Sequence, residues 1–250
     1  MRRAVLENWL EEFLNVEAVS DHLPNGLQIE GTGEVKKVLT AVSINLDVVR
    51  AALNEGADTI IVHHGMFWNN EQRTIKGYRR KRILQILNGN INLFAYHLPL
   101  DLHPEISHNR MILAKLDAQV PQEEGEKRIQ FGLKGLLKCP CSFEELVKRI
   151  NLALDAESRF FHYGKSTIGS LLVVSGAGRN LIDTVSELDV DAYLTGDAAE
   201  NTEYIAREEG LNYIFAGHYN TEKPGIIELG RRVEQEFGIP VRFFDSRNPL

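Results

Sequence analysis

Apolar residues along the chain follow two spacings, one typical of helices and one typical of buried strands. Residues 2–14 carry apolar side chains at helical spacing, whereas residues 35–44 alternate as a strand does. Residues 46–54 again show helical spacing. Two further apolar runs of strand length end at His64 and His97, and a helix-like segment precedes each. This succession of strands and helices predicts parallel strands joined by right-handed crossovers.

The second half of the chain repeats this order. Ser142, with Glu145 three residues later, forms a capping box, which predicts the start of a helix. Residues 118–127 are polar and include Pro121, so we expect a surface connection between the two halves there. Strands are expected near 159–163, 171–175, 192–195, 213–216 and 241–244, and helices near 180–188, 198–209 and 225–237.

These patterns predict an α/β fold with two similar α/β lobes, each with a mostly parallel sheet flanked by helices. The N-terminal lobe is expected to span residues 1–120 and the C-terminal lobe residues 121–250, with both lobes forming one compact unit. The strand ends at residues 62–65 and 194–197 resemble one another loosely, which favours a duplicated architecture.

Composition limits the functional classes open to the chain. Of its 250 residues, 43% are hydrophobic and 25% are charged, as in globular proteins. The net charge is -7 and the basic block at residues 79–82 is short, which disfavours nucleic acid as a partner. The N-terminus is amphipathic and no apolar run reaches the roughly 18 residues of a membrane span, so we expect a cytoplasmic protein without a membrane partner. Cys139 and Cys141 are too close for an unstrained disulfide and are interpreted as reduced thiols.

Histidines follow three of the apolar runs, at the point where each predicted strand ends. They are the adjacent pair His63 and His64, then His97, and then His218. If these strands are neighbours in a parallel sheet, the imidazoles lie at its carboxyl edge, where open α/β sheets bind ligands. Asp101 and Glu222 each follow one of these histidines by four residues. Six nitrogen and oxygen donors at one edge predict a metal site.

The donor set indicates which metals the site takes, and how many. Imidazole nitrogen and carboxylate oxygen suit Fe, Mn or Zn, whereas Mg prefers oxygen ligands alone. Six protein donors are too many for one catalytic ion with open positions, so we expect two divalent ions per chain. Because adjacent strand residues point to opposite faces, His63 and His64 share a centre only if the strand ends between them, which Gly65 permits. Pro99 predicts a turn rather than a helix at residues 97–101.

Other residues are candidates by position alone. A lone histidine is most often a surface or structural residue, and that interpretation applies to His22, His103, His108 and His162. His108, Asp197 and Glu200 are nevertheless the candidates for a general acid or base. The glycines of residues 176–178 follow a predicted strand, so they form either an anion site made of backbone amides or an ordinary turn.

The residues around these donors resemble a known family. Residues 20–31, SDHLPNGLQIEG, look like the N-terminal loop of the Nif-three-like family, also labelled GTP cyclohydrolase I type 2 homologues. The segments HHGMFW at 63–68, YHLPLD at 96–101 and GHYNTE at 217–222 are similar to its three metal motifs. The four motifs occur in order, and the resemblance runs from about residue 5 to the end, as in the short bacterial form of the family.

The resemblance implies two α/β lobes with a dinuclear metal site in the cleft between them, in a ring-shaped homohexamer whose metal sites face an internal cavity. Carried over position by position, the metal ligands would be His63, His64, His97, Asp101, His218 and Glu222. The loop with Asn25 and Gln28 would line the cleft, where both side chains are candidates to hydrogen-bond a substrate; a turn packed for structure is the alternative. Many members carry histidines shortly after the position of Asp197, where this chain has Ala199 and Glu200, so a proton-shuttle role there does not carry over.

Two interpretations of function stay open. The first is a metal-dependent hydrolase in which a water held between two ions attacks a small-molecule substrate that the sequence does not identify. The family label points to GTP, but the chain has neither a P-loop nor a G-x-G-x-x-G motif, so a phosphate ester or a cyclic amide is as plausible. The second is a non-enzymatic protein that stores or delivers iron, or acts as a scaffold or regulatory partner of other proteins.

Overall fold

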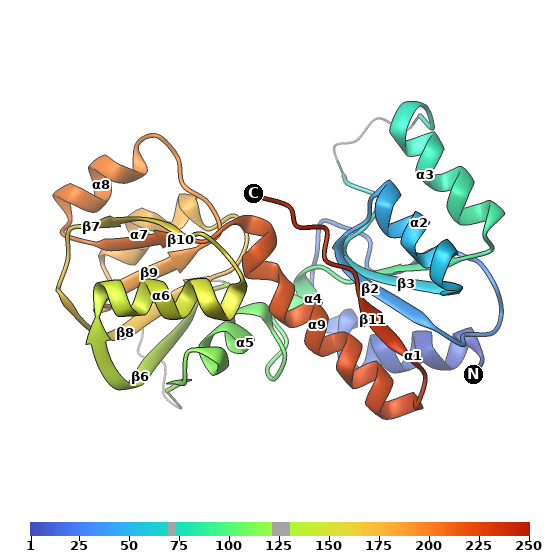
Figure 1. Ribbon diagram of the computed structural model, residues 1–250, viewed down its shortest axis with the longest axis horizontal. Helices are drawn as coiled ribbons and strands as arrows, with labels where there is room; N and C mark the ends of the chain where they lie inside the picture. The colour runs from blue at the N-terminus through green and yellow to red at the C-terminus, as the bar shows by residue number, and fades with distance from the viewer. Residues whose placement is uncertain (70–73, 122–130) are drawn as a thin grey trace. The chain divides into compact units, whose positions relative to one another are not determined.

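The computed structural model describes residues 1–69, 74–121 and 131–250. It divides into a first unit, Met1–Ile106 with Ile226–Arg247, and a second unit, Ser107–Gly225 with Asn248–Leu250. The course of the chain in each unit is drawn in Figure 1. The expected division into lobes 1–120 and 121–250 stays a prediction, and residues 122–127 of the expected surface connection lie outside the described residues.

A five-stranded sheet in the order β1-β4-β3-β2-β11 forms the centre of the first unit. Neighbouring strands are parallel from β4 to β11, and β1 pairs antiparallel with β4. The strands are β1 (Gly26–Ile29), β2 (Val38–Ser43), β3 (Thr59–His64), β4 (Asn92–Ala95) and β11 (Val241–Phe243). The parallel order confirms the predicted succession, whereas β1 lies inside a segment interpreted as a loop.

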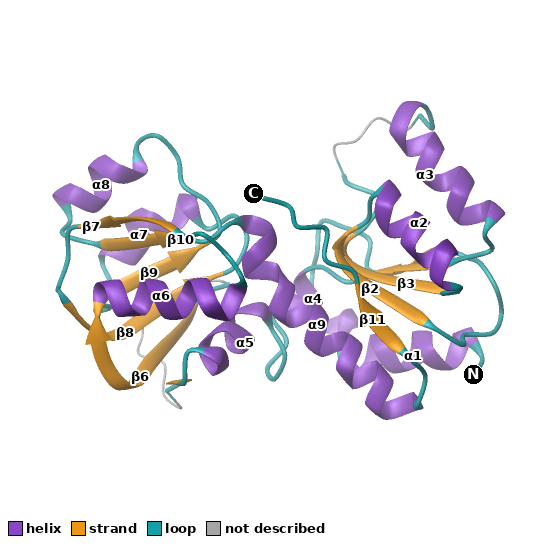
Figure 2. Cartoon of the chain, viewed as in Figure 1, coloured by secondary structure: helices purple, strands orange, loops and turns teal. Residues whose placement is uncertain are grey.

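Helices cover both faces of this sheet (Figure 2). One face packs on α2 and α3 through a cluster that includes Val48, Ile60 and Ile86. On the other face, α1 contacts α9 where the rings of Trp9 and Phe237 lie 5.5 Å apart. The elements are α1 (Arg3–Phe13), η1 (Val16–Ala18), α2 (Leu46–Glu55), α3 (Gly77–Asn88), α4 (Leu98–Asp101) and α9 (His218–Phe237), whose later part belongs to this unit.

The short helix α4 corrects one expectation from the sequence. Residues 97–101 were expected to form a turn because of Pro99, but Leu98–Asp101 is helical. Proline is tolerated in the first turn of a helix, since the amide it lacks has no partner within the helix. Asp101 therefore lies one helical turn after His97, and its amide bonds to the His97 carbonyl at 3.2 Å.

The second unit contains a six-stranded sheet in the order β5-β6-β8-β9-β10-β7. Its central pairs, β8 with β9 and β9 with β10, are parallel, and the outer pairs are antiparallel. The strands are β5 (Ala118–Gln119), β6 (Leu133–Ser142), β7 (Arg159–His162), β8 (Thr167–Val174), β9 (Ala192–Thr195) and β10 (Asn212–Phe215). Strand β6 was not expected from the sequence; its register with β8 shifts between Leu136 and Cys141, around Pro140.

Both faces of the second sheet are also buried by helices. Alternate residues of β8 face opposite sides: Leu171 packs with α5 and α6, and Leu172 packs with α7 and α8. Helix α6 begins as the capping box predicted, because the Ser142 hydroxyl accepts a hydrogen bond from the Glu145 amide at 3.2 Å. The elements are α5 (His108–Lys115), α6 (Phe143–Leu154), η2 (Arg179–Leu181), α7 (Ile182–Ser186) and α8 (Thr202–Glu208).

Helix α9 is longer than the sequence indicated. It was expected over 225–237 but begins at His218 and continues through Pro224. The Gly225 amide donates to Nδ1 of His108 at 3.1 Å. This early start places His218 and Glu222 one turn apart on the same helix.

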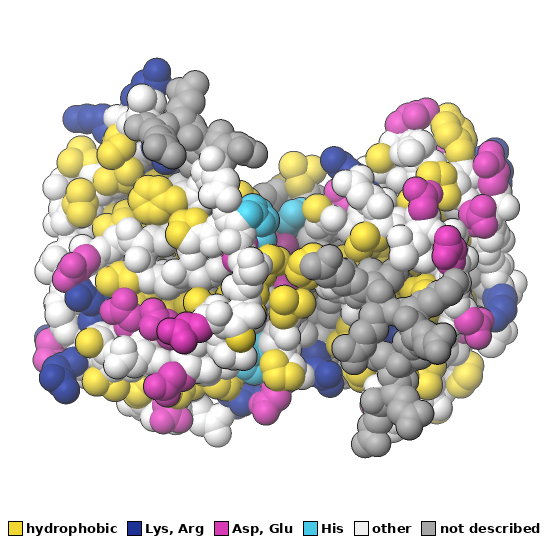
Figure 3. All heavy atoms as spheres, turned by 180° about the vertical axis from the view of Figure 1, so that it is seen from behind, with side chains coloured by type: hydrophobic (Ala, Val, Ile, Leu, Met, Phe, Trp, Pro, Cys, Tyr) yellow, Lys and Arg dark blue, Asp and Glu magenta, His cyan; other side chains and the backbone are white. Residues whose placement is uncertain are grey.

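The surface combines charged and hydrophobic side chains. On the face drawn in Figure 3, Lys and Arg side chains of the described residues are dispersed and form no continuous basic stripe. Within the described part of the chain, no helix is long and apolar enough to cross a membrane.

Candidate metal centre

Strand β3 places His63 and His64 at the carboxyl edge of the first sheet. His64 is the last residue of the strand and pairs in register with Ser43 of β2. His63 is fully buried. The two imidazole rings lie 4.5 Å apart between centroids. Strand β3 includes both residues and does not end between them, although such an ending was the condition expected for a shared centre. The short distance between the rings shows that this condition was wrong.

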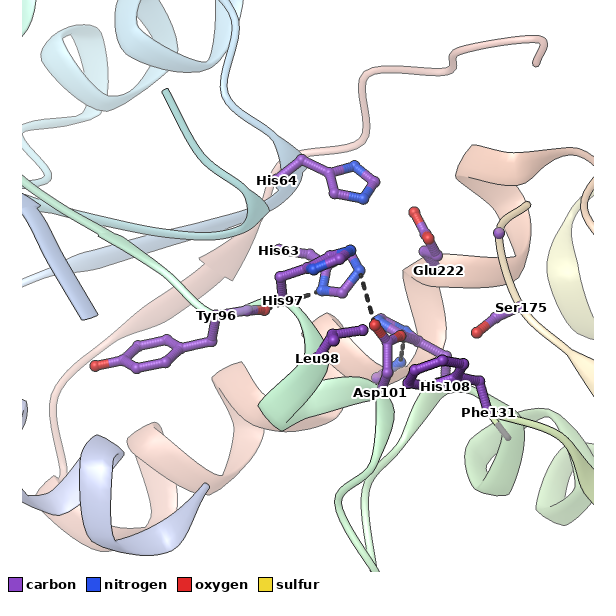
Figure 4. Close-up of polar contacts among 12 residues, drawn as sticks. His63, His64, Tyr96, His97, Leu98, Asp101, His108, Phe131, Ser175 and Glu222 are labelled. Atoms are coloured by element: carbon purple, nitrogen blue, oxygen red, sulfur yellow. Dashed lines mark hydrogen bonds and ion pairs between the residues drawn. The ribbon is translucent and has the colours of Figure 1, made fainter. Parts of the chain in front are cut away.

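His97 joins this pair from the neighbouring strand. It follows β4 and occupies the N-cap position of α4. Its ring centroid lies 5.1 Å from that of His63 and 5.7 Å from that of His64. One nitrogen from each of the three rings lies within 4.8 Å of the others, a spacing that allows one metal ion to contact all three. The first sheet therefore brings together three of the predicted ligands (Figure 4).

Asp101 lies beside the histidines. Its Oδ2 atom is 3.7 Å from Nε2 of His63, and both residues belong to the first unit. Figure 4 shows this carboxylate at the end of α4, pointing toward the His63 ring. Because a carboxylate next to imidazole nitrogens supplies the mixed N and O donors that transition metals accept, the described residues fit a metal ion.

Hydrogen bonds at Nδ1 hold each of the three imidazoles. Nδ1 of His63 lies 2.9 Å from the Tyr96 carbonyl oxygen. A carbonyl only accepts, so this nitrogen carries the proton, and the lone pair of His63 is on Nε2, the atom that a metal ion would contact. Nδ1 of His64 lies 3.0 Å from the hydroxyl of Ser43, which is able to donate or accept. Nδ1 of His97 lies 3.1 Å from Oδ2 of Asp21. Partners of this kind fix the orientation of metal-binding histidines.

His218 and Glu222 belong to the second unit. The strand before them, β10, lies in the second sheet, so the three strands that lead to histidines are not neighbours in one sheet, contrary to the expectation from the sequence. Nε2 of His218 lies 3.1 Å from Oε1 of Glu222, whose side chain is almost fully buried. The strand ends beside them are glycines: a Cβ on Gly196 would lie 2.7 Å from the His218 Cα, and one on Gly176 would lie 2.4 Å from Oε1 of Glu222. Their relation to the histidines of the first unit stays a prediction.

Asn25 and Gln28, predicted to line a substrate cleft, use their amide groups within the first unit. Oδ1 of Asn25 accepts from the His97 amide at 2.7 Å, and its Nδ2 donates to Asp21 at 3.0 Å. Oε1 of Gln28 accepts from the Met66 amide at 2.7 Å, and its Nε2 donates to the Pro24 carbonyl at 2.9 Å. These bonds favour the alternative, a structural role for this turn. The turn holds the segment after β3 through Met66 and the segment after β4 through His97.

The three acid–base candidates lie in the second unit. His108 is fully buried and accepts the Gly225 amide at Nδ1. Asp197 accepts the Arg179 amide at 3.0 Å and pairs with the Arg179 guanidinium at 3.2 Å. Glu200 is exposed, and its hydrogen bond with Tyr204 raises the pKa of the Tyr204 hydroxyl. Their roles stay predictions.

The backbone amides of both glycines in the turn at residues 176–178 form hydrogen bonds within the second unit. The amide of Gly176 donates to the Thr221 hydroxyl at 2.9 Å, and the amide of Gly178 donates to the Thr195 hydroxyl at 3.0 Å. Because these amides are already bonded within the second unit, the turn is favoured over an anion site made of the same amides.

Sequence reasoning missed Asp21 and Ser43, which hold His97 and His64. Asp21 was visible in the sequence only as the start of an Asx turn, since its Oδ1 accepts from the Leu23 amide two residues on. Ser43 could have been found by placing the ends of β2 and β3 side by side, because it pairs with His64.

The chain is similar to known proteins along its whole length. Residues 1–249 match the family model described as DUF34/NIF3, NGG1p interacting factor 3. The chain belongs to the DUF34/NIF3 family. Two curated relatives, from Haemophilus influenzae and Escherichia coli strain K12, are both named GTP cyclohydrolase 1 type 2 homolog. Each is 36% identical to the chain over 250 residues, with all of both chains covered. The family resemblance of the sequence motifs is thereby confirmed.

Solved structures of relatives confirm the mixed α/β fold with two sheets flanked by helices. The protein ybgI, described as of unknown function, superposes with a TM-score of 0.94 at 36% identity. A protein from Thermus thermophilus has a TM-score of 0.89 at 30% identity, and both comparisons cover all of each chain. Reduced HcgD from Methanocaldococcus jannaschii, at 24% identity, has a TM-score of 0.85 over 98% of both chains and supports the fold alone.

Proposed function

We propose that this DUF34/NIF3 protein is a metal-dependent hydrolase with two divalent metal ions per chain. The observation that supports it most directly is the convergence of His63, His64 and His97 at one sheet edge, with Asp101 beside them. His218 and Glu222 are proposed as the remaining ligands. Their 3.1 Å contact and the burial of Glu222 support the pairing of these two donors.

Chemistry of the donor atoms favours Fe, Mn or Zn over Mg. Four imidazoles make the donor set rich in nitrogen, which suits transition metals. When bound, two such ions would supply an activated water molecule as the nucleophile for hydrolysis. The protein's part is to hold the imidazoles rigidly, which the Nδ1 bonds of His63 and His64 do within the first sheet.

The substrate we propose is a small molecule with a hydrolysable phosphate ester or cyclic amide. The curated relatives are named homologues of a GTP cyclohydrolase, and that name supports a nucleotide as one member of the test set. We do not extend it to GTP alone, because the sequence lacks a nucleotide-phosphate motif and the amides of Gly176 and Gly178 already donate within the fold.

Metal content per chain tests the proposal first. Protein purified without a histidine tag is analysed by elemental analysis, beside the variants His64→Ala and His162→Ala. His162 is a half-buried histidine of β7 outside the predicted ligands and serves as the control. Close to two transition-metal ions per chain, retained in the control and lost in His64→Ala, support the site. No bound metal after anaerobic addition of Fe, Mn or Zn contradicts it.

Turnover then separates a catalytic site from a structural one. A catalytic site keeps an open coordination position, whereas a structural site is closed. Phosphate esters, nucleotides and cyclic amides are screened with the metal-loaded protein and with Asp101→Ala and Glu222→Ala. Loss of turnover with folding and assembly intact supports the hydrolase. Loss of folding or assembly in both variants contradicts a catalytic role.

The alternative is a non-enzymatic protein that stores or delivers iron or acts as a scaffold. The family description names an interacting factor, which favours this candidate. A ring-shaped homohexamer is proposed for both functions, and light scattering of the wild type tests it. Metal bound with every coordination position filled, and no turnover in the screen, favours storage or scaffolding.

A further inference from the structure

Asp21 is a buried carboxylate in contact with a predicted metal ligand. Its side chain is 2% exposed, and its two oxygens lie 3.2 and 3.1 Å from Nδ1 of His97. The two residues are 76 positions apart in the sequence, and the fold brings them together. Both lie in the first unit.

Other donors already occupy the Asp21 carboxylate. The amide of Leu23 donates to Oδ1 at 3.0 Å. The side chain of Asn25 and the amide of Leu98 donate to Oδ2 at 3.0 and 2.9 Å. With Nδ1 of His97 added, four nitrogen atoms lie within hydrogen-bond distance of the carboxylate, which has roughly four lone-pair positions. A metal ion at Asp21 would have to displace one of them, so Asp21 is better suited to hold a ligand than to be one.

The donors around Asp21 show that both of its carboxylate oxygens act as hydrogen-bond acceptors. Both oxygens of Asp21 accept from N–H groups and so face His97 as acceptors, which places the proton of neutral His97 on Nδ1 and its lone pair on Nε2. Oδ1 of Asn25 meanwhile accepts the His97 amide at 2.7 Å, which fixes the backbone of the same residue.

We propose that Asp21 is a positioning residue that selects the Nδ1–H tautomer of His97 and thereby presents Nε2 as the metal-coordinating atom. The inference rests on the metal site proposed above. It extends to His97 the arrangement at His63, where a carbonyl accepts a hydrogen bond from Nδ1–H and the lone pair on Nε2 is left to coordinate. Orienting partners of this kind typically change metal affinity by roughly 10–100-fold when removed.

A second explanation is that Asp21, His22 and His97 form a separate metal group, since one donor atom of each lies within 4.8 Å of the others. His22 is 61% exposed, and its Nδ1 lies 3.4 Å from Oδ1 of Asp21. That contact is looser than the bond from His97, and Asp21 has no lone pair to spare for an ion. Removing the His22 side chain distinguishes the two explanations.

The tautomer of His97 is measured first, in the metal-free wild type, by nitrogen-15 NMR of the imidazole with assignment from His97→Gln. We expect the proton on Nδ1 in the wild type and its transfer to Nε2 in Asp21→Asn. A wild-type His97 with its proton on Nε2 overturns the proposal before Asp21→Asn is measured. This readout needs neither bound metal nor turnover, so it decides on Asp21 even if the proposed hydrolase fails.

Metal affinity is measured second, by competition with a chromophoric chelator. We expect roughly 10–100-fold weaker binding in Asp21→Asn and unchanged binding in His22→Ala. Asp58→Asn is the matched control, because that half-buried carboxylate also accepts a backbone amide, from Lys36 at 2.8 Å, but contacts no predicted ligand. Equal losses in Asp21→Asn and Asp58→Asn, or a loss in His22→Ala as large as in Asp21→Asn, overturn the proposal.

Discussion

Gly176 lies in the turn after β8, where Glu222 approaches the backbone. Its φ is +67°, and a Cβ built there would lie 2.4 Å from Oε1 of Glu222 and 3.3 Å from Nε2 of His218. Non-bonded heavy atoms settle at roughly 3.5 Å, so an alanine at this position moves the carboxylate by about 1 Å. Such a movement breaks the 3.1 Å contact between Glu222 and His218.

A matched glycine separates this displacement from backbone strain. Gly56, the C-cap of α2, also has a φ of +67°, but a Cβ there has no atom within 4 Å. A side chain in the left-handed region costs roughly 1–2 kcal/mol, so Gly56→Ala and Gly176→Ala both lose about this much stability. Gly176→Ala alone also displaces a predicted ligand.

Urea unfolding of the metal-free proteins measures the shared backbone cost, and chelator competition measures metal affinity. We expect Gly56→Ala to bind metal as the wild type does and Gly176→Ala to bind at least 10-fold more weakly, roughly the lower end of the range for lost support of a ligand. Wild-type affinity in Gly176→Ala would refute the reasoning, because it would mean that Glu222 is not a ligand in its observed position.

Three further predictions concern other parts of the molecule. Asp191 has a pKa lowered to about 2, because hydrogen bonds from a lysine, a serine and two amides outweigh the effect of burial. Its contribution is present above the unfolded value of 3.8 and is lost as the pH falls toward about 2; Asp191→Asn should therefore cost about 2 kcal/mol at pH 7 and less at pH 3, measured by urea unfolding. Burial lowers the pKa of His103, so the unfolded state takes up a proton at a higher pH than the folded state. The contribution of His103 to stability is therefore fully present above pH 6.5 and decreases below it. In thermal unfolding, His103→Gln should flatten this pH dependence. The Trp68 ring lies 5.5 Å from His64, so we expect Fe, Mn or another open-shell ion to quench fluorescence in the wild type and in Trp9→Phe but not in Trp68→Phe.

The strand-end histidines were predictable because their signal is local. The buried strands β3 and β4 each contain a short apolar run. A few consecutive residues are therefore enough to recognise the strand and to identify the histidine that follows its apolar part. Parallel pairing of the two strands then places their ends at one edge, where His64 and His97 lie. The capping box of α6 is equally local, and its bond between Ser142 and Glu145 is confirmed.

Elements that depend on distant partners were not predictable. Apolar and polar residues alternate only weakly along strand β6, which also contains Pro140. Its pairing with β8 is what makes it a strand. From the local sequence, Pro224 predicts a helix boundary, but helix α9 continues through it. The Gly225 amide that follows donates to His108, a residue far away in the sequence. In both cases a contact far along the chain outweighs the local preference.

The same reasoning limits what a ligand motif says about metal binding. His97 and Glu222 are visible in the sequence, but the residues that support them are distant. Asp21, which holds His97, is 76 positions away from it. Gly176, which leaves room for Glu222, is 46 positions away from it (222 less 176). A chain that kept all six predicted ligands but carried a larger residue in place of Gly176 would retain every motif and displace one donor. Family members are therefore better compared at the supporting positions as well as at the ligands, because the supporting residues decide whether the donor atoms converge.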